Sequence, residues 1–320
     1  MGAMRVRSRR AFVTQAGAVV LVVGGLAVMP ADASGVSCGS VLTANTTLAQ
    51  DLSCGSGDGL VISTSGITLD LNGHTITGAG TITPAGIRIT PGVSGVTVQK
   101  GAIVGFNTGV VADTTNESHI TKLEVRAVDQ GILLANATNA LVDKNSVTGA
   151  GRDGIKVDGS DNTVTQNTVT DNTWGVSVSN GSTGNDVSKN VLTGNRVDGI
   201  AVFDGAGTTL IEKNTVSGGT NGIEITGGAS ATTVSKNAAS GASRHGIWVQ
   251  ADTSGTLLSK NTSSGNGGDG IHVDSIDTTI TKNSASGNAG WGIFAVSGVT
   301  DGGGNSSSGN GSPCAGVVCS

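Results

Sequence analysis

The chain of 320 residues contains no tyrosine, and aromatic residues make up only 2% of it. A compact globular core usually depends on large aromatic side chains, so this composition argues against a core of that kind. An interior without them must be built from many small layers of Ile, Val and Leu. Together with 53 glycines and abundant Asn, Ser and Thr, this favours a repetitive β architecture over helices.

Long apolar runs are missing outside the N-terminus, so we expect no membrane-spanning segment there. Residues 5–10 contain four arginines, residues 16–28 are apolar, and residues 31–33 read Ala-Asp-Ala, a small-x-small cleavage signal. This pattern predicts an export signal at residues 1–33. The stretch SRRAFV at residues 8–13 also looks like a twin-arginine signal; the alternative is a general secretory signal with a chance arginine pair.

Basic residues are too few for a nucleic-acid-binding protein. Cleavage after Ala33 would leave 14 basic and 22 acidic residues, a net charge of −8. Such a balance indicates neither a nucleic acid nor an anionic membrane as a partner. We expect a secreted monomer.

Glycine followed by Ile or Val recurs every 21 to 24 residues. These glycines are Gly86, Gly109, Gly131, Gly154, Gly175, Gly199, Gly222, Gly246, Gly270 and Gly292. A second marker recurs every 22 to 24 residues, at Asn145, Asn167, Asn190, Asn214, Asn237, Asn261, Asn283 and Asn305. Two markers in phase over most of the chain predict a solenoid.

Each repeat divides into three short strands, as residues 154–157, 163–165 and 168–170 illustrate. Three strands per repeat with no helical stretch predict one coil of a parallel β-helix. We expect Asn167 and its equivalents to adopt the left-handed conformation at a corner, and their amides to hydrogen bond from coil to coil. The glycine before each first strand is expected to meet the same conformational need at another corner.

The pattern GIxV…TxxxN…GN, with LDLNGHTI at residues 69–76, resembles the right-handed parallel β-helix superfamily. That group includes pectate-lyase-like enzymes, uronan epimerases and NosD-like proteins. The resemblance covers residues 38–310 and implies an all-β, right-handed parallel β-helix solenoid of about ten to twelve coils. It specifies the fold and not the function, because one solenoid supports many activities.

The expected organisation is an N-terminal cap with the first coils at residues 34–85, regular repeats at 86–310 and a tail at 311–320. Two cysteines, Cys38 and Cys54, precede the regular repeats, and two others, Cys314 and Cys319, follow them. Ten or more coils at about 4.8 Å each separate the two pairs by roughly 50 Å. The geometry then allows only Cys38–Cys54 and Cys314–Cys319, which would hold the terminal coils after export.

Ligand-binding groups in a solenoid must lie at outward positions, because the inward residues form the core. Counting each repeat glycine as zero, positions +2 and +4 point outward, and position −1 lies at the preceding corner. These positions hold all three tryptophans together with Phe203 and Phe294. The substrate-binding candidates are Trp174, Glu224, Trp248, Gln250, Trp291 and Phe294.

Exposed rings that fill no core usually bind a ligand, and sugar rings stack well on them. We therefore expect an extracellular polysaccharide to bind along the first sheet. The resemblance agrees, because the substrate groove of the family's enzymes runs there. The alternative is that the rings cover gaps at a corner or shield apolar strand edges.

The catalytic candidates gather on the last coils and are Arg244, His245, Asp269, His272 and Asp274. A uronan lyase or epimerase needs a base for the C5 proton, a cation for the carboxylate and an acid for the departing oxygen. Either histidine, the arginine and an aspartate could fill these roles. A glycoside hydrolase would instead use two carboxylates about 5 to 9.5 Å apart, such as Asp269 and Asp274.

Family motifs do not select among these reactions. The Asp-Pro-His-Glu signature of uronan epimerases is absent, and so are the Asp-Asp pair and the Gly-His-Gly of polygalacturonases. The second hypothesis is therefore a non-catalytic structural or adhesive surface protein. No cofactor is certain.

Metal ligands are suggested by a second acidic group, in which Asp153, Asp158 and Asp198 could hold calcium through oxygen atoms. Aspartate is equally expected at turns, so a structural role is the alternative. Eight of the nine lysines form another regular column, one residue before the corner position that asparagine occupies in most coils. This lysine column could bind an anionic polymer or could prevent sideways association, and we favour the second role.

Overall fold

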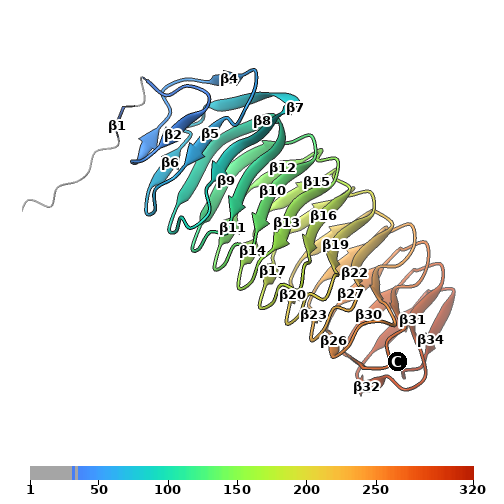
Figure 1. The fold of residues 1–320 in the computed structure, drawn as a ribbon. Helices are drawn as coiled ribbons and strands as arrows, with labels where there is room; N and C mark the ends of the chain where they lie inside the picture. The colour runs from blue at the N-terminus through green and yellow to red at the C-terminus, as the bar shows by residue number, and fades with distance from the viewer. Residues whose placement is uncertain (1–30, 33–34) are drawn as a thin grey trace, which may run out of the picture.

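The computed structural model describes residues 31–32 and 35–320. These residues wind into a long parallel β-solenoid of about twelve turns, and the described part contains no helix (Figure 1). The predicted all-β parallel solenoid is confirmed. The predicted export signal lies outside the described residues, apart from β1 (Ala31–Asp32), which pairs with β3 (Thr46–Thr47).

Each turn contributes one strand to each of three parallel ladders, which we call the first, second and third sheets. The first sheet contains β2 (Ser40–Leu42), β5 (Leu60–Ile62), the ends of β7 (Thr75–Ile89) and β8 (Thr97–Asp113), β10 (Gln130–Ala135), β13 (Asp153–Asp158), β16 (Trp174–Val178), β19 (Asp198–Val202), β22 (Asn221–Ile225), β25 (Ile247–Val249), β28 (Ile271–Val273), β31 (Trp291–Ala295) and β34 (Ser312–Ala315).

The other two sheets follow the same order along the solenoid. The second sheet contains β1, β3, β6 (Thr68–Asp70), the starts of β8 and β9 (His119–Arg126), β11 (Leu141–Asp143), β14 (Thr163–Thr165), β17 (Asp186–Ser188), β20 (Leu210–Glu212), β23 (Thr233–Ser235), β26 (Thr256–Ser259), β29 (Thr278–Thr281) and β32 (Thr300–Gly303). The third sheet contains β4 (Leu52–Cys54), the start of β7, the middle of β8, the end of β9, β12 (Ser146–Thr148), β15 (Thr168–Thr170), β18 (Val191–Thr193), β21 (Thr215–Ser217), β24 (Ala238–Ser240), β27 (Thr262–Ser264), β30 (Ser284–Ser286) and β33 (Ser306–Ser308).

Each coil supplies one layer of a continuous aliphatic core. In the coil that begins at Gly154, the side chains of Ile155, Val157, Val164 and Val169 are at most 1% exposed. Alternate residues point inward along each strand, so short Thr-Val-Thr strands suffice to place one valine in the core. Because a single coil cannot bury its own apolar side chains, the stack as a whole carries the stability.

The corner asparagines form the predicted ladder. The side-chain amide of Asn167 donates to the side-chain oxygen of Asn190 at 3.0 Å, and the amide of Asn190 donates in the same way to Asn214. The ladder runs without a break from Asn145 to Asn305. These amides are buried, so the ladder satisfies polar groups that water does not reach.

The prediction that the asparagine itself adopts the left-handed conformation is wrong. The residue before it does so, and φ is +57° at Lys189, +57° at Lys213 and +58° at Gln166. The corner needs a residue with positive φ and a side chain that makes buried hydrogen bonds, and two different residues meet these needs. The backbone turn is made by an exposed lysine or glutamine, and the buried hydrogen bonds are made by the asparagine.

The glycine before each strand of the first sheet was predicted to provide a positive φ, but the structure gives a steric reason for it. Gly154 does not have a positive φ, but a Cβ atom there would lie 2.5 Å from Val169 and 2.8 Å from the carbonyl oxygen of Gly175. The chain passes so close to the next coil that no side chain fits. These glycines therefore permit close packing of one coil on the next.

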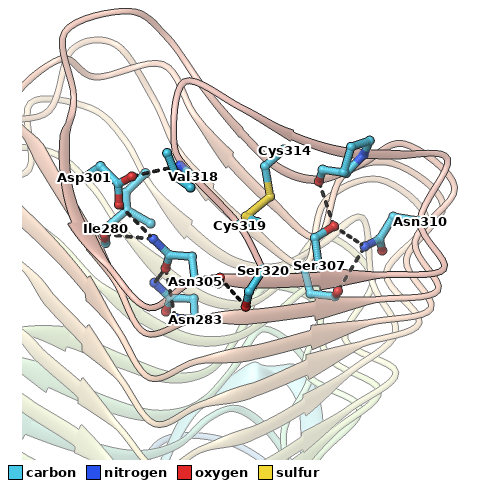
Figure 2. Close-up of a disulfide and its surroundings, with 12 residues drawn as sticks. Ile280, Asn283, Asp301, Asn305, Ser307, Asn310, Cys314, Val318, Cys319 and Ser320 are labelled. Carbon is cyan, nitrogen blue, oxygen red and sulfur yellow. Dashed lines mark hydrogen bonds between the residues drawn. A yellow bond between two sulfur atoms is a disulfide. The ribbon is translucent and has the colours of Figure 1, made fainter.

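Both predicted disulfides are present, one at each end of the solenoid. Cys38 is bonded to Cys54, and Cys314 is bonded to Cys319. Figure 2 shows the C-terminal bond beside Asn305, whose carbonyl oxygen accepts a hydrogen bond from the backbone N–H of Ser320. The last segment of the chain thus folds back onto the end of the asparagine ladder.

Candidate functional site

The outer face of the first sheet, from β16 to β31, carries the partly exposed aromatic side chains of the described protein. They are Trp174, Phe203, Trp248, Trp291 and Phe294. The sixth described ring, Phe106, is fully buried and lies against the glycine backbone at Gly78 and Gly86. The rings at the predicted outward positions therefore share one face.

A hollow of about 330 Å³ opens on this face. Trp174 and Phe203 provide its aromatic surface, and Asp198 and Glu224 place carboxyl groups in it. Trp174 pairs in register with Asp198 on the next strand, so the ring and the carboxyl group are neighbours along the sheet. The hollow combines apolar walls with a few polar groups, as ligand sites commonly do.

Asp198 is almost completely buried at the side of this hollow. Its carboxyl group accepts a hydrogen bond from the side-chain amide of Asn221 at 3.0 Å and also hydrogen bonds to Glu224. Burial, together with the charge and hydrogen bond of Glu224, raises the pKa of Asp198 to about 8. At neutral pH this carboxyl group is therefore mostly protonated and can donate a hydrogen bond.

Glu224 links the hollow to the next coils. One of its oxygens accepts a hydrogen bond from the side-chain amide of Gln250 at 2.5 Å, and the other accepts from Asn221 at 3.4 Å. Two predicted substrate-binding residues, Glu224 and Gln250, thus contact each other. Sequence reasoning missed the contact between Asp198 and Glu224, although their positions, −1 and +2 on adjacent coils, are a signal that could have found it.

Three catalytic candidates meet farther along the same face. Nδ1 of His272 lies 2.5 Å from Oδ2 of Asp269, and Nδ1 of His245 lies 3.6 Å from the same oxygen. The two imidazole rings lie with their centroids 4.5 Å apart on adjacent coils. Among the described residues, these form the one set of three or more His, Cys, Asp and Glu side chains whose ligand atoms all lie within 4.8 Å of one another.

The two histidines have different electrostatic surroundings. Burial and the neighbouring His272 lower the pKa of His245 to about 4, so its imidazole is neutral at pH 7. In agreement, its Nδ1 accepts a hydrogen bond from the backbone N–H of Asp269 at 3.1 Å. His272 instead has a carboxylate at each ring nitrogen, because its Nε2 lies 3.1 Å from Oδ1 of Asp274.

Aromatic and cationic groups surround this cluster. Nε1 of Trp248 donates to Oδ2 of Asp274 at 2.9 Å, and the guanidinium carbon of Arg244 lies 4.0 Å from the centroid of the Trp248 ring. Trp248 and His272 pair in register on adjacent strands, but their rings do not stack. The rings meet edge-on, with centroids 6.3 Å apart, while His272 stacks on Phe294 at 4.7 Å.

The geometry does not favour a hydrolase that uses Asp269 and Asp274. His272 lies between their carboxyl groups and is hydrogen bonded to both, so no space remains between them for a sugar. Asp198 and Glu224 are in direct contact, which is closer than the separation of about 5 Å or more that glycosidases use. Trp291, the last substrate-binding candidate, donates its backbone N–H to Oδ1 of Asp269 at 2.6 Å.

The calcium candidates have separate partners. Asp153 accepts hydrogen bonds from the side chains of Gln130 and Ser177. Asp158 forms an ion pair of 3.0 Å with Lys156. Asp198 belongs to the hollow described above. The lysine column lies on another edge of the solenoid, where a hollow of about 400 Å³ is lined in part by Lys100, Lys122 and Glu124.

No described helix has the length and apolar character needed to cross a membrane. A family model described as "Right handed beta helix region" matches residues 51–210 and 186–318. No curated protein sequence matches the chain significantly.

Solved structures with the same fold include the A-module of a mannuronan C-5 epimerase from Azotobacter vinelandii. It has a TM-score of 0.58 and 16% identity, over 86% of this chain and 91% of that one. The Dettilon tailspike protein has a TM-score of 0.59 and 19% identity, over 87% of this chain and 62% of that one. The Streptococcus pneumoniae surface protein and adhesin PfbA has a TM-score of 0.56 and 10% identity, over 83% and 90%. These likenesses support the fold.

Proposed function

The chain belongs to the right-handed β-helix family, and from this premise we propose that the outer face of its first sheet binds an extracellular polysaccharide. One observation carries the proposal. All five partly exposed rings of the described residues lie on this face, and two of them line a hollow that also contains carboxyl groups. Rings stack on the faces of sugars, while carboxyl and amide groups hydrogen bond to sugar hydroxyls.

The named relatives support a partner of this class. One of the solved neighbours is a mannuronan epimerase, and mannuronan is a polysaccharide. Another is a surface adhesin. The two disulfides agree with an extracellular location, because disulfides form and persist in oxidising compartments.

The site supports binding better than hydrolysis. Asp198 and Glu224 are too close to each other for hydrolysis, and His272 occupies the space between Asp269 and Asp274. The proton of Asp198 is engaged in its hydrogen bond with Glu224, so these two groups lower the negative charge of the hollow instead. Arg244, which is exposed and lies over Trp248, supplies a cation that could meet an acidic sugar at this end of the face.

Binding can be tested by affinity electrophoresis in gels that contain alginate or a neutral glucan. We expect retardation of the wild type in at least one gel, with loss of most of it in Trp174→Ala and Phe203→Ala. Val191→Ala is the matched control, because Val191 is 46% exposed but lies on the third sheet. Wild-type mobility that no polysaccharide changes would contradict the proposal.

The same samples can be tested for chemistry. An increase in ultraviolet absorbance at the unsaturated-uronate band would show lyase activity, and we expect none because the site is proposed to bind only. His272→Gln is the reference for that signal, since it removes the base that a lyase would use. Retardation of the wild type without any absorbance change supports a binding protein, whereas a wild-type absorbance increase that His272→Gln loses would indicate a lyase.

A further inference from the structure

We propose that His245, Asp269 and His272 form a binding site for a divalent first-row transition-metal ion, with zinc as the reference ion. The site lies on adjacent coils, with His272 in β28 and with His245 and Asp269 just before β25 and β28. It does not depend on the polysaccharide proposal, because it uses none of the groups that line the hollow at Trp174. The ligand atoms of these three residues lie within 4.8 Å of one another. Only four histidines occur in the chain, and two of them meet here.

The distances between the donor atoms suit an ion of this size. Zinc binds nitrogen and oxygen ligands at about 2.0–2.2 Å, which places two ligand atoms of a tetrahedral site roughly 3.3–3.6 Å apart. Nδ1 of His245 and Oδ2 of Asp269 lie 3.6 Å apart. Nδ1 of His272 is only 2.5 Å from the same oxygen, because a proton joins them, and the ion would take the place of that proton.

The outer atoms of two ligands are already held by other groups. Nε2 of His272 faces Oδ1 of Asp274, whose other oxygen accepts from Trp248. Oδ1 of Asp269 accepts the backbone N–H of Trp291, which leaves Oδ2 directed toward the histidines. Metal-binding histidines usually donate their second nitrogen to a carboxylate in this way, and such partners orient the ligand.

His245 can reach the ion through either nitrogen. Its Nδ1 lies inside the cluster but accepts the backbone N–H of Asp269, so coordination there requires that hydrogen bond to break. A rotation of the ring presents Nε2 instead, which has no hydrogen-bond partner among the described residues. This side chain is buried among neighbouring rings, with the centroids of His272 at 4.5 Å and of Trp248 at 5.6 Å, which restricts its other movements.

The chemistry of the ligands favours a transition ion over calcium. Calcium takes six to eight oxygen ligands, whereas two imidazoles and one carboxylate suit zinc and its neighbours. The carboxylates of Asp269 and Asp274 balance the charge of a divalent ion. The side chains of His245, Asp269 and His272 are 9%, 10% and 20% exposed, so water or a ligand can reach a fourth position.

Isothermal titration of the chelator-treated, full-length protein with zinc chloride tests the proposal. We expect one ion per chain, with affinity reduced at least tenfold in His272→Gln and in Asp269→Asn. Asp274→Asn leaves all three ligands in place and should weaken binding about tenfold through the outer shell. Cobalt(II) added in place of zinc should give a visible absorption band in the wild type that Asp269→Asn loses.

His119→Gln is the matched control. His119 also pairs with an aspartate, Asp143, at 2.7 Å, but no third ligand completes a cluster there. We expect zinc binding to be unchanged in this variant, and the melting temperatures of all variants without metal show whether each one is folded. Three results would each overturn the proposal: no saturable zinc or cobalt binding by the wild type, unaltered affinity in folded Asp274→Asn and His272→Gln, or equal loss in His119→Gln.

Trp174→Ala separates this site from the proposed function. It removes part of the hollow and none of the metal ligands, so it should lose polysaccharide retardation and keep zinc binding. Zinc binding without any retardation of the wild type would contradict the proposed function alone. Retardation without zinc binding would contradict the metal site alone.

Discussion

The carboxyl groups of Asp198 and Glu224, on the neighbouring strands β19 and β22, hydrogen bond to each other in the hollow beside Trp174. A hydrogen bond between two carboxyl groups requires a proton on one of them. Asp198, whose pKa is raised, keeps this proton at neutral pH. Its protonation affects both the charge of the hollow and the stability of the fold.

The buried proton predicts a pH dependence of stability. The pKa of Asp198 is about 8 in the folded chain and about 3.9 in an unfolded one, so between these values the folded chain keeps a proton that the unfolded chain has lost. This contribution to the free energy of unfolding is complete below about pH 4. It decreases as the pH rises toward 8, by up to about 1.4 kcal/mol per pH unit, and is lost above that pH.

Asp198→Asn should flatten that slope, because the amide keeps a donor at this position and does not titrate. The measurement is urea unfolding of both proteins at several pH values between 5 and 9. Equal slopes for wild type and variant would show that the proton is not held by this pair.

The lysine column predicts that some corners are strained. Lys189 has a φ of +57°, and asparagine adopts this region more readily than lysine. Lys189→Asn should therefore stabilise the fold by about 0.5 kcal/mol, as a fraction of the cost of about 1–2 kcal/mol for the left-handed conformation. Lys156, in strand β13, is the control: asparagine is disfavoured in strands, so Lys156→Asn should destabilise. Denaturant unfolding measures both changes, and stabilisation by both or by neither contradicts the argument.

The asparagine ladder predicts a large effect from a single amide. Asn214 accepts from the backbone and side-chain N–H groups of Asn190 and donates to Val187 and Asn237. Asn214→Ala leaves these buried groups without partners and should cost about 2–4 kcal/mol. Ser146→Ala, at an exposed position of β12, should change the free energy of unfolding by less than about 0.5 kcal/mol. Similar costs for the two variants would mean that the ladder contributes little.

The two disulfides should differ in their contributions. Cys38 and Cys54 are separated by 16 positions, and Cys314 and Cys319 by 5. Because the longer loop restricts the unfolded chain more, replacing the first pair by serines should cost about 3 kcal/mol and replacing the second about 2 kcal/mol. Thermal unfolding measures the difference, and hydrogen exchange should show faster exchange confined to the terminal coils nearest each replaced pair. A larger loss from the C-terminal pair would contradict the loop argument.

The fold could be predicted because every coil requires the same residue types at the same positions. Glycines and asparagines in phase reveal the coil, and the distance between the two ends of the solenoid then fixes the disulfide pairing. The ladder of amides follows from the same repetition. The pattern could not show which residue of a corner has the positive φ and which makes the buried hydrogen bonds. Lys189 and Asn190 are adjacent and recur with the same period, so the sequence does not separate their roles. Only the backbone shows that the lysine makes the turn.

The candidate site was less predictable than the fold. Counting positions placed Trp248, His272 and Phe294 in one column, which the register of the strands confirms. The position count could not predict the side-chain orientations, which place the ring of Trp248 edge-on to that of His272. Nor could the position count show that Asp198, one of the calcium candidates, would be buried against Glu224, because that depends on how the sheet face is covered.

The left-handed lysines make one edge of the molecule a line of charge. Coils stack about 4.8 Å apart, and at this distance two unit charges in water repel by about 0.9 kcal/mol, more than the thermal energy of about 0.6 kcal/mol. Lys260 and Lys282, on consecutive coils, form no ion pair within the described residues, whereas Glu212 is shared by Lys213 and Lys236. Counter-anions should therefore gather toward the C-terminal end of this edge. Duplication of a coil would add one lysine to this edge and leave the number of charges per unit length unchanged.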